Sequence, residues 1–160
     1  VKEDYDIVII DTPPSRDIYA EIALIAADYL IIPSDLKPFA NQGLPTVLEF
    51  IGQIDEFRAL IGKNDLAILG ILPSKISTNS RFFNYVFPKQ KESLLNSHNV
   101  PIMNSIIFER TVLSQCTNQT ITMGDLEIPD PQSVLEFAPD SPAAMEFVQL
   151  TEEVLEKLGK

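Results

Sequence analysis

The stretch Tyr5-Asp6-Ile7-Val8-Ile9-Ile10-Asp11-Thr12-Pro13-Pro14 decides the fold that the sequence predicts. Its β-branched run, residues 5–10, is typical of a strand buried in a parallel sheet. The Thr-Pro-Pro run after it cannot continue a strand or lie inside a helix, so a rigid turn is expected there. Asp11 would then stand at the carboxyl end of a strand, where parallel α/β sheets form their sites.

Strands and helices are predicted to alternate along the rest of the chain. The predicted strands lie at residues 29–33, at 66–72 and within 102–108, and the predicted helices lie at 17–27, 41–61, 81–96, 111–115 and 142–158. Pro88 is expected to break or kink the helix at 81–96, and residues 120–138 are expected to form a loop. This alternation predicts a mostly parallel sheet with helices on both faces, in one partial α/β domain over residues 1–160.

The composition limits the classes of protein that remain possible. Of the 160 residues, 45% are hydrophobic and 22% are charged, as in a soluble globular protein. No apolar run approaches the roughly 20 residues that cross a bilayer, so no membrane contact is expected. A single cysteine, Cys116, excludes an internal disulfide and a cysteine-based metal cage. A cytoplasmic location is the simplest expectation.

Cations are few in this chain, whose net charge is −11, but some of them cluster. Arg81, Lys89 and Lys91 alternate with aromatic residues, a pattern that could contact phosphates and stack on bases. The alternative is an aromatic core face flanked by solvated lysines. The acidic balance opposes binding to nucleic acid, so non-specific DNA is only a possible partner.

The chemistry of Asp11 suggests a role with magnesium. A carboxylate at a strand end can hold the water shell of Mg²⁺ beside a triphosphate, because Mg²⁺ keeps most of its waters. The alternative role is a carboxylate that forms a turn or caps a helix. The magnesium interpretation requires residues 5–10 to lie in a parallel sheet, paired with a neighbouring strand.

The Asp-Thr-Pro-Pro sequence after this strand resembles the Walker B and switch II signature of the ParA/MinD-type (SIMIBI class) P-loop ATPases. Four further stretches resemble motifs of that family in the same order: Ala26-Ala27-Asp28 before the strand to Pro33, Phe39-Ala40 with Gly43-Leu44, Leu69-Gly70-Ile71-Leu72, and Leu113-Ser114-Gln115 with Gln in place of Glu. The resemblance covers residues 5 to about 158. It implies a nucleotide held between two subunits and a homodimer that ATP closes.

The resemblance also implies roles for individual residues. Asp11 would orient a Mg²⁺-bound water, and Thr12, Pro13 and Pro14 would belong to the switch that senses the γ-phosphate. Residues implied to lie near the adenine base are Ser74, Lys75, Phe108, Glu109 and Arg110. Two of these depart from the family pattern, because Phe replaces a Pro and Glu replaces an Arg.

One element of the chemistry is absent from the sequence. Glycine occurs only at positions 43, 52, 62, 70, 124 and 159, so no glycine-rich loop followed by Lys and Ser or Thr is present. We therefore expect ATP and Mg²⁺ to be used only in a parent protein that supplies this loop. We expect no ATP hydrolysis by the 160 residues alone, and we assign no catalytic residue.

The implied function is chromosome or plasmid partitioning, or cargo positioning, by an ATPase with a partner protein of ParB type. An alternative is a non-catalytic module for dimerisation or partner binding that has lost nucleotide use. A third possibility is another SIMIBI branch, such as a capsular tyrosine kinase, although no tyrosine follows Tyr85.

Overall fold

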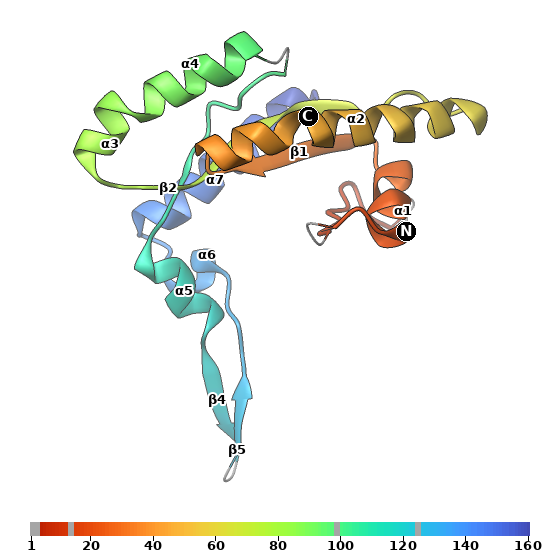
Figure 1. The fold of residues 1–160 in the computed structure, drawn as a ribbon. Helices are drawn as coiled ribbons and strands as arrows, with labels where there is room; N and C mark the ends of the chain where they lie inside the picture. Colours follow the sequence, from red (N-terminus) through yellow and green to blue (C-terminus); the bar gives the residue numbers. More distant parts are fainter. Residues whose placement is uncertain (1–3, 13–14, 98–99, 124–125) are drawn as a thin grey trace. The chain divides into compact units, whose positions relative to one another are not determined.

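The computed structural model describes residues 4–12, 15–97, 100–123 and 126–160, and it divides into two compact units. The first unit comprises Val1–Leu30 with Gly43–Ile68, and the second comprises Ile31–Gln42 with Leu69–Lys160. The units are described separately below (Figure 1). The prediction of a single partial domain over residues 1–160 stays a prediction.

The first unit contains helix α1 (Ile18–Ala26) and most of helix α2 (Pro38–Leu60). Asp17 caps α1, since its carboxylate accepts hydrogen bonds from the backbone N–H groups of Tyr19 and Ala20 at 3.0 and 3.1 Å. Both helices were predicted, although α2 begins three residues before its predicted start at residue 41 and continues through Pro45.

Arg58 of α2 joins the two helices of this unit and is only 2% exposed. Its guanidinium donates to the carbonyls of Leu24, Ile25 and Ala27 at 2.7–2.9 Å, and to the carbonyl of Asn64 at 2.8 Å. The last carbonyls of a helix have no partner within the helix, so a cation supplies the missing donors. Arg58 therefore fixes the C-terminal end of α1 against α2.

The prediction of a buried strand at residues 5–10 is wrong for this structure. Residues 7–12 have no regular secondary structure, and Ile9 is 89% exposed. A β-branched run forms a strand only when backbone groups of a neighbouring strand complete its hydrogen bonds. No strand of the described part of the chain pairs with residues 5–10, and their hydrophobic side chains are therefore left uncovered.

The sheet consists of β1 (Tyr29–Ser34), β2 (Ala67–Ile76) and β3 (Ile107–Phe108), in the order β1-β2-β3. β2 and β3 run parallel, with Ser74 opposite Ile107 and Ile76 opposite Phe108. The strands predicted at residues 29–33, 66–72 and within 102–108 are confirmed. β2 continues four residues beyond its predicted end at residue 72.

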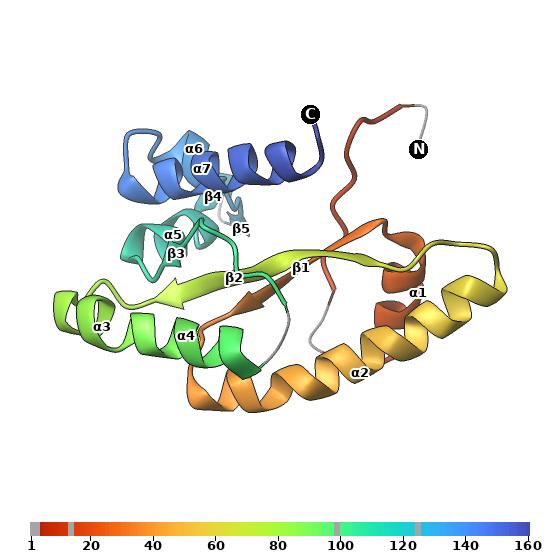
Figure 2. The same cartoon turned by 90° about the horizontal axis from the view of Figure 1, so that it is seen from above.

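Helices of the second unit cover both faces of its part of the sheet, as predicted (Figure 2). On one face, Leu72 and Ile107 form a core cluster with Met103, onto which Phe147 and Leu150 of helix α7 (Pro142–Lys157) pack. The other face carries helix α3 (Ser80–Tyr85) and helix α4 (Phe87–Ser97), through ring contacts centred on Phe83. The break between α3 and α4 falls at Val86, two residues before Pro88, and confirms the predicted interruption.

Residues 120–138 do not form the predicted loop. After helix α5 (Thr111–Thr117), β4 (Thr120–Met123) and β5 (Leu126–Pro129) pair as an antiparallel hairpin, and helix α6 (Val134–Phe137) follows. The two strands are short but alternate apolar and other residues, a period that three nearby prolines obscured. Ser133 and Glu136 form a capping box that starts α6.

Two carboxylates of α7 bind β3 and the segment before it. Glu146 accepts a hydrogen bond from the backbone N–H of Phe108 at 3.1 Å, and Glu153 accepts from the N–H groups of Asn104 and Ser105 at 2.9 and 2.7 Å. Burial alone would raise the pKa of Glu153. The hydrogen bonds from Ser105 and Asn104, with nearby Lys157, outweigh burial and lower this pKa below its usual value. Among the described helices, none is long and apolar enough to cross a membrane.

Candidate functional site

The exits of β2 and β3 lie side by side in the second unit and form the first candidate site. The register between the two strands shifts between Ser74 and Ile76, and Lys75, at this bulge, has a φ of 54°. Positive φ in a residue with a side chain is uncommon and concentrates at functional positions. The bulge therefore marks the carboxyl end of β2 as a specialised segment.

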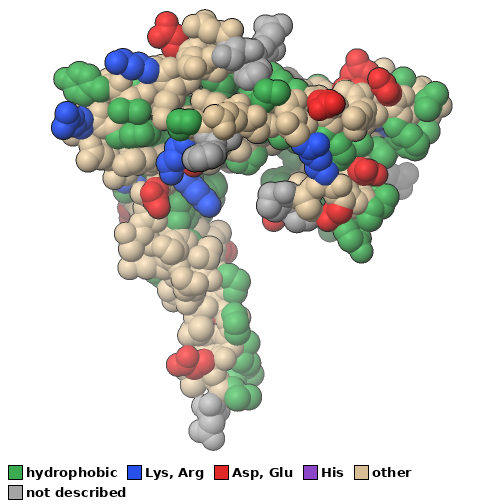
Figure 3. Space-filling view, in the orientation of Figure 1, with side chains coloured by type: hydrophobic (Ala, Val, Ile, Leu, Met, Phe, Trp, Pro, Cys, Tyr) green, Lys and Arg blue, Asp and Glu red, His purple; other side chains and the backbone are tan. Residues whose placement is uncertain are grey.

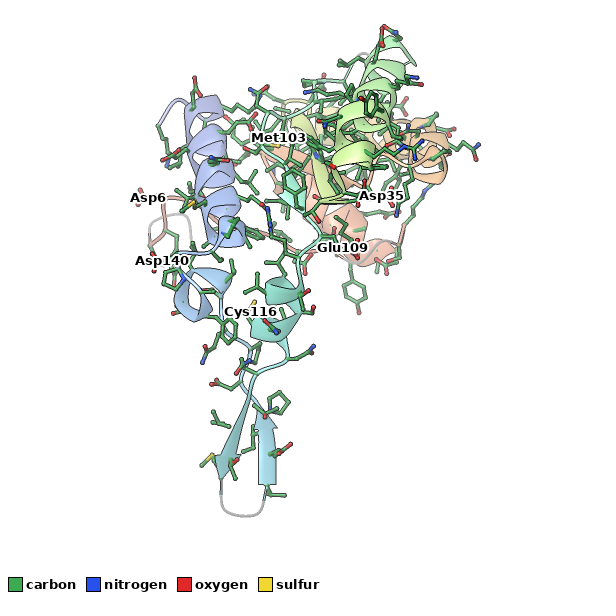
Figure 4. All side chains as sticks on the ribbon, turned by 90° about the vertical axis from the view of Figure 1, so that its left-hand side faces the viewer. Asp6, Asp35, Met103, Glu109, Cys116 and Asp140 are labelled. Atoms are coloured by element: carbon green, nitrogen blue, oxygen red, sulfur yellow. The ribbon has the colours of Figure 1, made fainter. Side chains whose placement is uncertain are left out.

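A cavity of about 350 Å³ opens beyond these strand ends. It is lined by Ser77, Thr78, Glu109, Arg110, Thr111 and Ser114. Glu109 lies between β3 and α5 (Figure 4) and donates its backbone N–H to the carbonyl of Ile76 at 2.8 Å. Of the five residues implied to contact the base, Glu109 and Arg110 line this cavity, whereas Ser74, Lys75 and Phe108 do not.

The cations and rings around the cavity already have partners. Arg110 pairs with Glu146 at 2.7 Å and lies over the ring of Phe108, 5.5 Å from its centroid. Phe108 also contacts the ring of Phe83 at 5.4 Å. Because Glu146 neutralises Arg110 and Glu109 adds negative charge, the cavity suits an uncharged polar ligand better than a phosphate.

Sequence analysis missed four hydroxyl residues of this cavity: Ser77, Thr78, Thr111 and Ser114. These residues follow the ends of β2 and β3 by one to six residues. Their short distance in sequence from a strand end was the only signal that could have identified them as cavity residues. Ser77 accepts a hydrogen bond from the N–H of Asn79, which in turn caps α3. The contact of Ser74, Lys75, Phe108, Glu109 and Arg110 with a nucleotide base stays a prediction.

Residues 11, 12 and 15–17 form the second candidate site and belong to the first unit. Asp11 and Thr12 are exposed, and Pro13 and Pro14 lie outside the described residues. Beyond them, the Ser15 hydroxyl donates to the Asp17 carboxylate at 2.7 Å, and the Arg16 guanidinium lies 5.9 Å from the centre of the Phe50 ring. The hydrogen bond from Ser15, followed by that from the Ala20 N–H, lowers the pKa of Asp17.

Arg16 and Asp17 thus contact α2 and α1, and Asp11 is exposed. An exposed carboxylate is a suitable hard oxygen ligand for the water shell of Mg²⁺. Its predicted position at the end of a sheet strand is not observed, because residues 7–10 form no strand. The described residues therefore do not meet the condition set for the magnesium role, which needs a pairing strand from elsewhere and stays a prediction.

A third candidate site is a pocket of about 840 Å³ in the second unit, between the start of α2 and helices α3 and α4. Arg81 and Lys89 line it together with Tyr85, which is 70% exposed. Lys91 does not line this pocket, so the structure brings together two of the three cations that the sequence singled out.

The aromatic residues of this segment divide between two environments. Phe83 stacks on Phe87 at 5.3 Å, and Phe87 is 5% exposed, so these two rings belong to the core as the alternative interpretation proposed. Tyr85 alone among the rings of α3 and α4 lines the pocket. A pattern of aromatic residues in a sequence does not separate rings that pack inside from rings that face outward.

Two buried amide oxygens in the same pocket have no hydrogen-bond partner among the described residues. They are Asn41 Oδ1 from α2 and Gln90 Oε1 from α4. A buried acceptor without a donor is costly, but both oxygens are closed to solvent and are not themselves contacts for a ligand. Arg81 and Lys89 add positive charge, so the pocket suits an anionic ligand.

Comparisons with known proteins find one matching family model and several similar proteins. A family model described as an AAA domain matches residues 1–81. The virulence plasmid ParA family protein pGP5-D of Chlamydia psittaci is 30% identical over 162 residues, which cover 99% of this chain and 52% of that protein. An uncharacterized protein of Methanocaldococcus jannaschii is 29% identical over 159 residues, 99% of this chain and 54% of the relative.

A third relative is named for the distribution of a cellular compartment. The maintenance of carboxysome distribution protein A of Synechococcus elongatus is 27% identical over 138 residues, 81% of this chain and 52% of the relative. The chain therefore spans about half the length of these curated relatives.

Proposed function

Because this chain belongs to the ParA/MinD-type family of P-loop ATPases, we propose that it forms part of an ATPase that positions or partitions a cargo. The observation that carries this proposal is the family match over residues 1–81, which includes the Asp-Thr-Pro-Pro turn. The names of two relatives, a plasmid ParA family protein and a carboxysome distribution protein, support a role in positioning. The cargo would be bound through a partner protein of ParB type.

We assign the chemistry of this ATPase as follows. Asp11 would orient a water of the Mg²⁺ shell, and Thr12 would move with the switch turn as the γ-phosphate is lost. Bound ATP with Mg²⁺ supplies the phosphoryl group that water attacks. The cavity beyond β2 and β3 would hold the base, because its hydroxyl groups and the neutralised Arg110 suit an uncharged polar ring.

The remaining phosphate contacts must come from outside these residues. The sequence has no glycine-rich loop followed by Lys and Ser or Thr, and the relatives are about twice as long as this chain. We propose that a strand and a phosphate-binding loop from the rest of the protein complete the site. Pairing with that strand would order residues 5–10 and cover their exposed side chains.

ATP-gated dimerisation of the whole protein tests the proposed function. With Mg²⁺ and a non-hydrolysable ATP analogue, sedimentation analysis should give twice the monomer mass, and with ADP it should give the monomer. Removing Mg²⁺ serves as a control and should also give the monomer. The same mass with both nucleotides would contradict the proposal.

The non-catalytic alternative predicts a different result in the same experiment. A module that has lost nucleotide use would dimerise, or bind its partner, independently of ATP. The absence of the predicted strand at residues 5–10 is the observation that favours this alternative. Measurable binding of ATP to the whole protein would contradict this alternative.

We further propose that the pocket lined by Arg81 and Lys89 contacts DNA phosphates without reading sequence. The two cations and exposed Tyr85 face one pocket, which gives phosphate contact and a possible stacking surface. Lys91 lies outside this pocket and would contribute only a more distant positive charge.

Replacing Arg81 and Lys89 together with alanine should raise the Kd for non-specific duplex DNA by about tenfold and reduce the log–log salt slope by about two. A titration of the dimeric whole protein at several salt concentrations measures both quantities. The double variant Lys157→Ala/Lys160→Ala removes the same charge from the C-terminal end and should bind as wild type does. Equal Kd values for the two double variants would mean that DNA affinity depends only on the net charge of the protein and not on this pocket.

A further inference from the structure

The hairpin of β4 and β5 presents an apolar face to solvent. Ile121 pairs with Ile128, and Met123 pairs with Leu126. Residues two apart on a strand, and residues directly opposite each other, point to the same face, so these four side chains share one face. All four are exposed, from 38% for Ile128 to 68% for Leu126.

The opposite face of the hairpin has a different character. Thr122 pairs with Glu127, and Thr120 pairs with Pro129. This face is polar and carries the exposed carboxylate of Glu127. In the view of Figure 3, hydrophobic side chains follow one side of the hairpin.

The base of the hairpin is well anchored. The backbone N–H of Asp130 donates to the carbonyl of Gln119 at 2.7 Å, and that of Gln132 donates to the carbonyl of Cys116 at 3.0 Å. Cys116 is 3% exposed and packs with Val134 and Ala143. The strands above this base are exposed along their whole length. A two-stranded hairpin is marginally stable by itself, and exposed apolar patches usually mark interaction sites.

We propose that the outer edge of β4 binds an extended segment of a partner protein in which apolar residues alternate with Lys or Arg. Added as a third strand, such a segment would place its apolar side chains beside Ile121 and Met123. Its cationic side chains would lie on the face of Glu127. The edge of β5 is less suitable, because Pro129 has no N–H group to donate.

Charge complementarity argues for a basic partner rather than a second copy of this chain. Residues 111–156 contain nine Asp or Glu residues and no Lys, Arg or His. A second hairpin would bring its own Glu127 to a face that already has one, and each copy has a net charge of −11. A cationic segment instead gains from this field at every distance.

This surface goes beyond the ATPase function and does not depend on it. No residue of the hairpin or of its base lines one of the three candidate sites. Helix α5 contributes different residues to the hairpin base and to the cavity beyond β2 and β3. Binding at the hairpin can therefore be measured without nucleotide. ATP turnover of the same variants reports separately on the proposed function.

Labelled eight-residue peptides test the proposal against the full-length protein by fluorescence anisotropy. A peptide that alternates valine with lysine should bind at least about tenfold more tightly than one that alternates valine with glutamate, because like charges oppose docking. A peptide that alternates serine with lysine has the same charge without the apolar face, and it should also bind at least about tenfold more weakly. Equal binding of the two lysine peptides would mean that charge alone determines the affinity, and it would overturn the proposal.

Variants of the hairpin locate the binding. Ile121→Thr/Met123→Thr should weaken the valine–lysine peptide by about tenfold, whereas Thr122→Ser on the opposite face should leave it unchanged. Glu127→Lys should reduce the preference for the valine–lysine peptide over the valine–glutamate peptide. Because these side chains are exposed, circular dichroism and the melting temperature should stay those of wild type. Hydrogen exchange should slow at residues 120–123 and not at 126–129 when the peptide is bound.

Two further outcomes would overturn the proposal. Undiminished peptide binding by Ile121→Thr/Met123→Thr would place the peptide elsewhere. If the wild-type protein is a dimer without nucleotide and the double variant is a monomer, a second copy of this chain occupies the surface.

Discussion

Replacing Asp11 with asparagine is expected to lower the ATP turnover number of the whole protein by at least about 100-fold. Asparagine keeps the shape of the side chain and removes the negative charge, so it can no longer orient the water shell of a magnesium ion in the same way. The expectation rests on the exposed carboxylate at residue 11 and on the family match that includes it. A coupled assay of phosphate release under saturating ATP and Mg²⁺ measures the effect.

The neighbouring substitution Asp17→Asn provides the matched control. Asparagine also caps helices, so it can still accept the hydrogen bonds from the Tyr19 and Ala20 N–H groups. Turnover by this variant should stay within about twofold of wild type. ATP binding by the Asp11 variant, measured with a fluorescent analogue, separates loss of catalysis from loss of folding. Wild-type turnover by Asp11→Asn would show that Asp11 is only a turn residue.

Replacing Gly70 with alanine is expected to destabilise the protein by about 2–4 kcal/mol. Gly70 has a φ of 151°, and a Cβ atom there would lie 3.0 Å from Met103 Cγ and 3.1 Å from the carbonyl oxygen of Pro101. That carbonyl already accepts a hydrogen bond from the Ile71 N–H at 2.8 Å, so it cannot move away without losing it. The midpoint of urea unfolding measures the loss.

Gly52 is the natural control for this substitution. It lies inside α2, and no atom lies within 4 Å of the position that its Cβ would occupy. Gly52→Ala should leave stability unchanged or raise it by up to about 1 kcal/mol, because alanine favours helices. Equal unfolding midpoints for Gly70→Ala and wild type would mean that the backbone around Pro101 and Met103 adjusts at little cost.

Most of the secondary structure could be predicted from the sequence, since periodic apolar residues, caps and prolines act locally. Asp17 marks the start of α1, and Pro142 begins α7 in its first turn. The two errors in secondary structure have different causes. Residues 5–10 have the composition of a strand but no neighbouring strand among the described residues, and β4 and β5 are too short for their alternation to stand out beside three prolines.

The candidate sites were predictable only in part. The resemblance to the ATPase family singled out Glu109 and Arg110, and both line the cavity at the exits of β2 and β3. The pairing of Arg110 with Glu146 was not predictable, because 36 residues separate them. The same applies to the pocket of Arg81 and Lys89, where Asn41 comes from a helix far away in the sequence. Contacts between distant residues depend on tertiary packing, which periodicity does not encode.

Glu146 and Glu153 stand seven residues apart on α7. Glu146 accepts from the backbone N–H of Phe108 in β3, and Glu153 accepts from those of Asn104 and Ser105 before it. Two turns of an α-helix take about seven residues, so the two carboxylates point in nearly the same direction. Inserting or deleting one residue between them would rotate one carboxylate by about 100° relative to the other. The length of this helical segment is therefore constrained even where its side chains are exposed. If α7 is replaced by the corresponding helix of a relative, the seven-residue spacing of the two carboxylates should matter more than the residues between them.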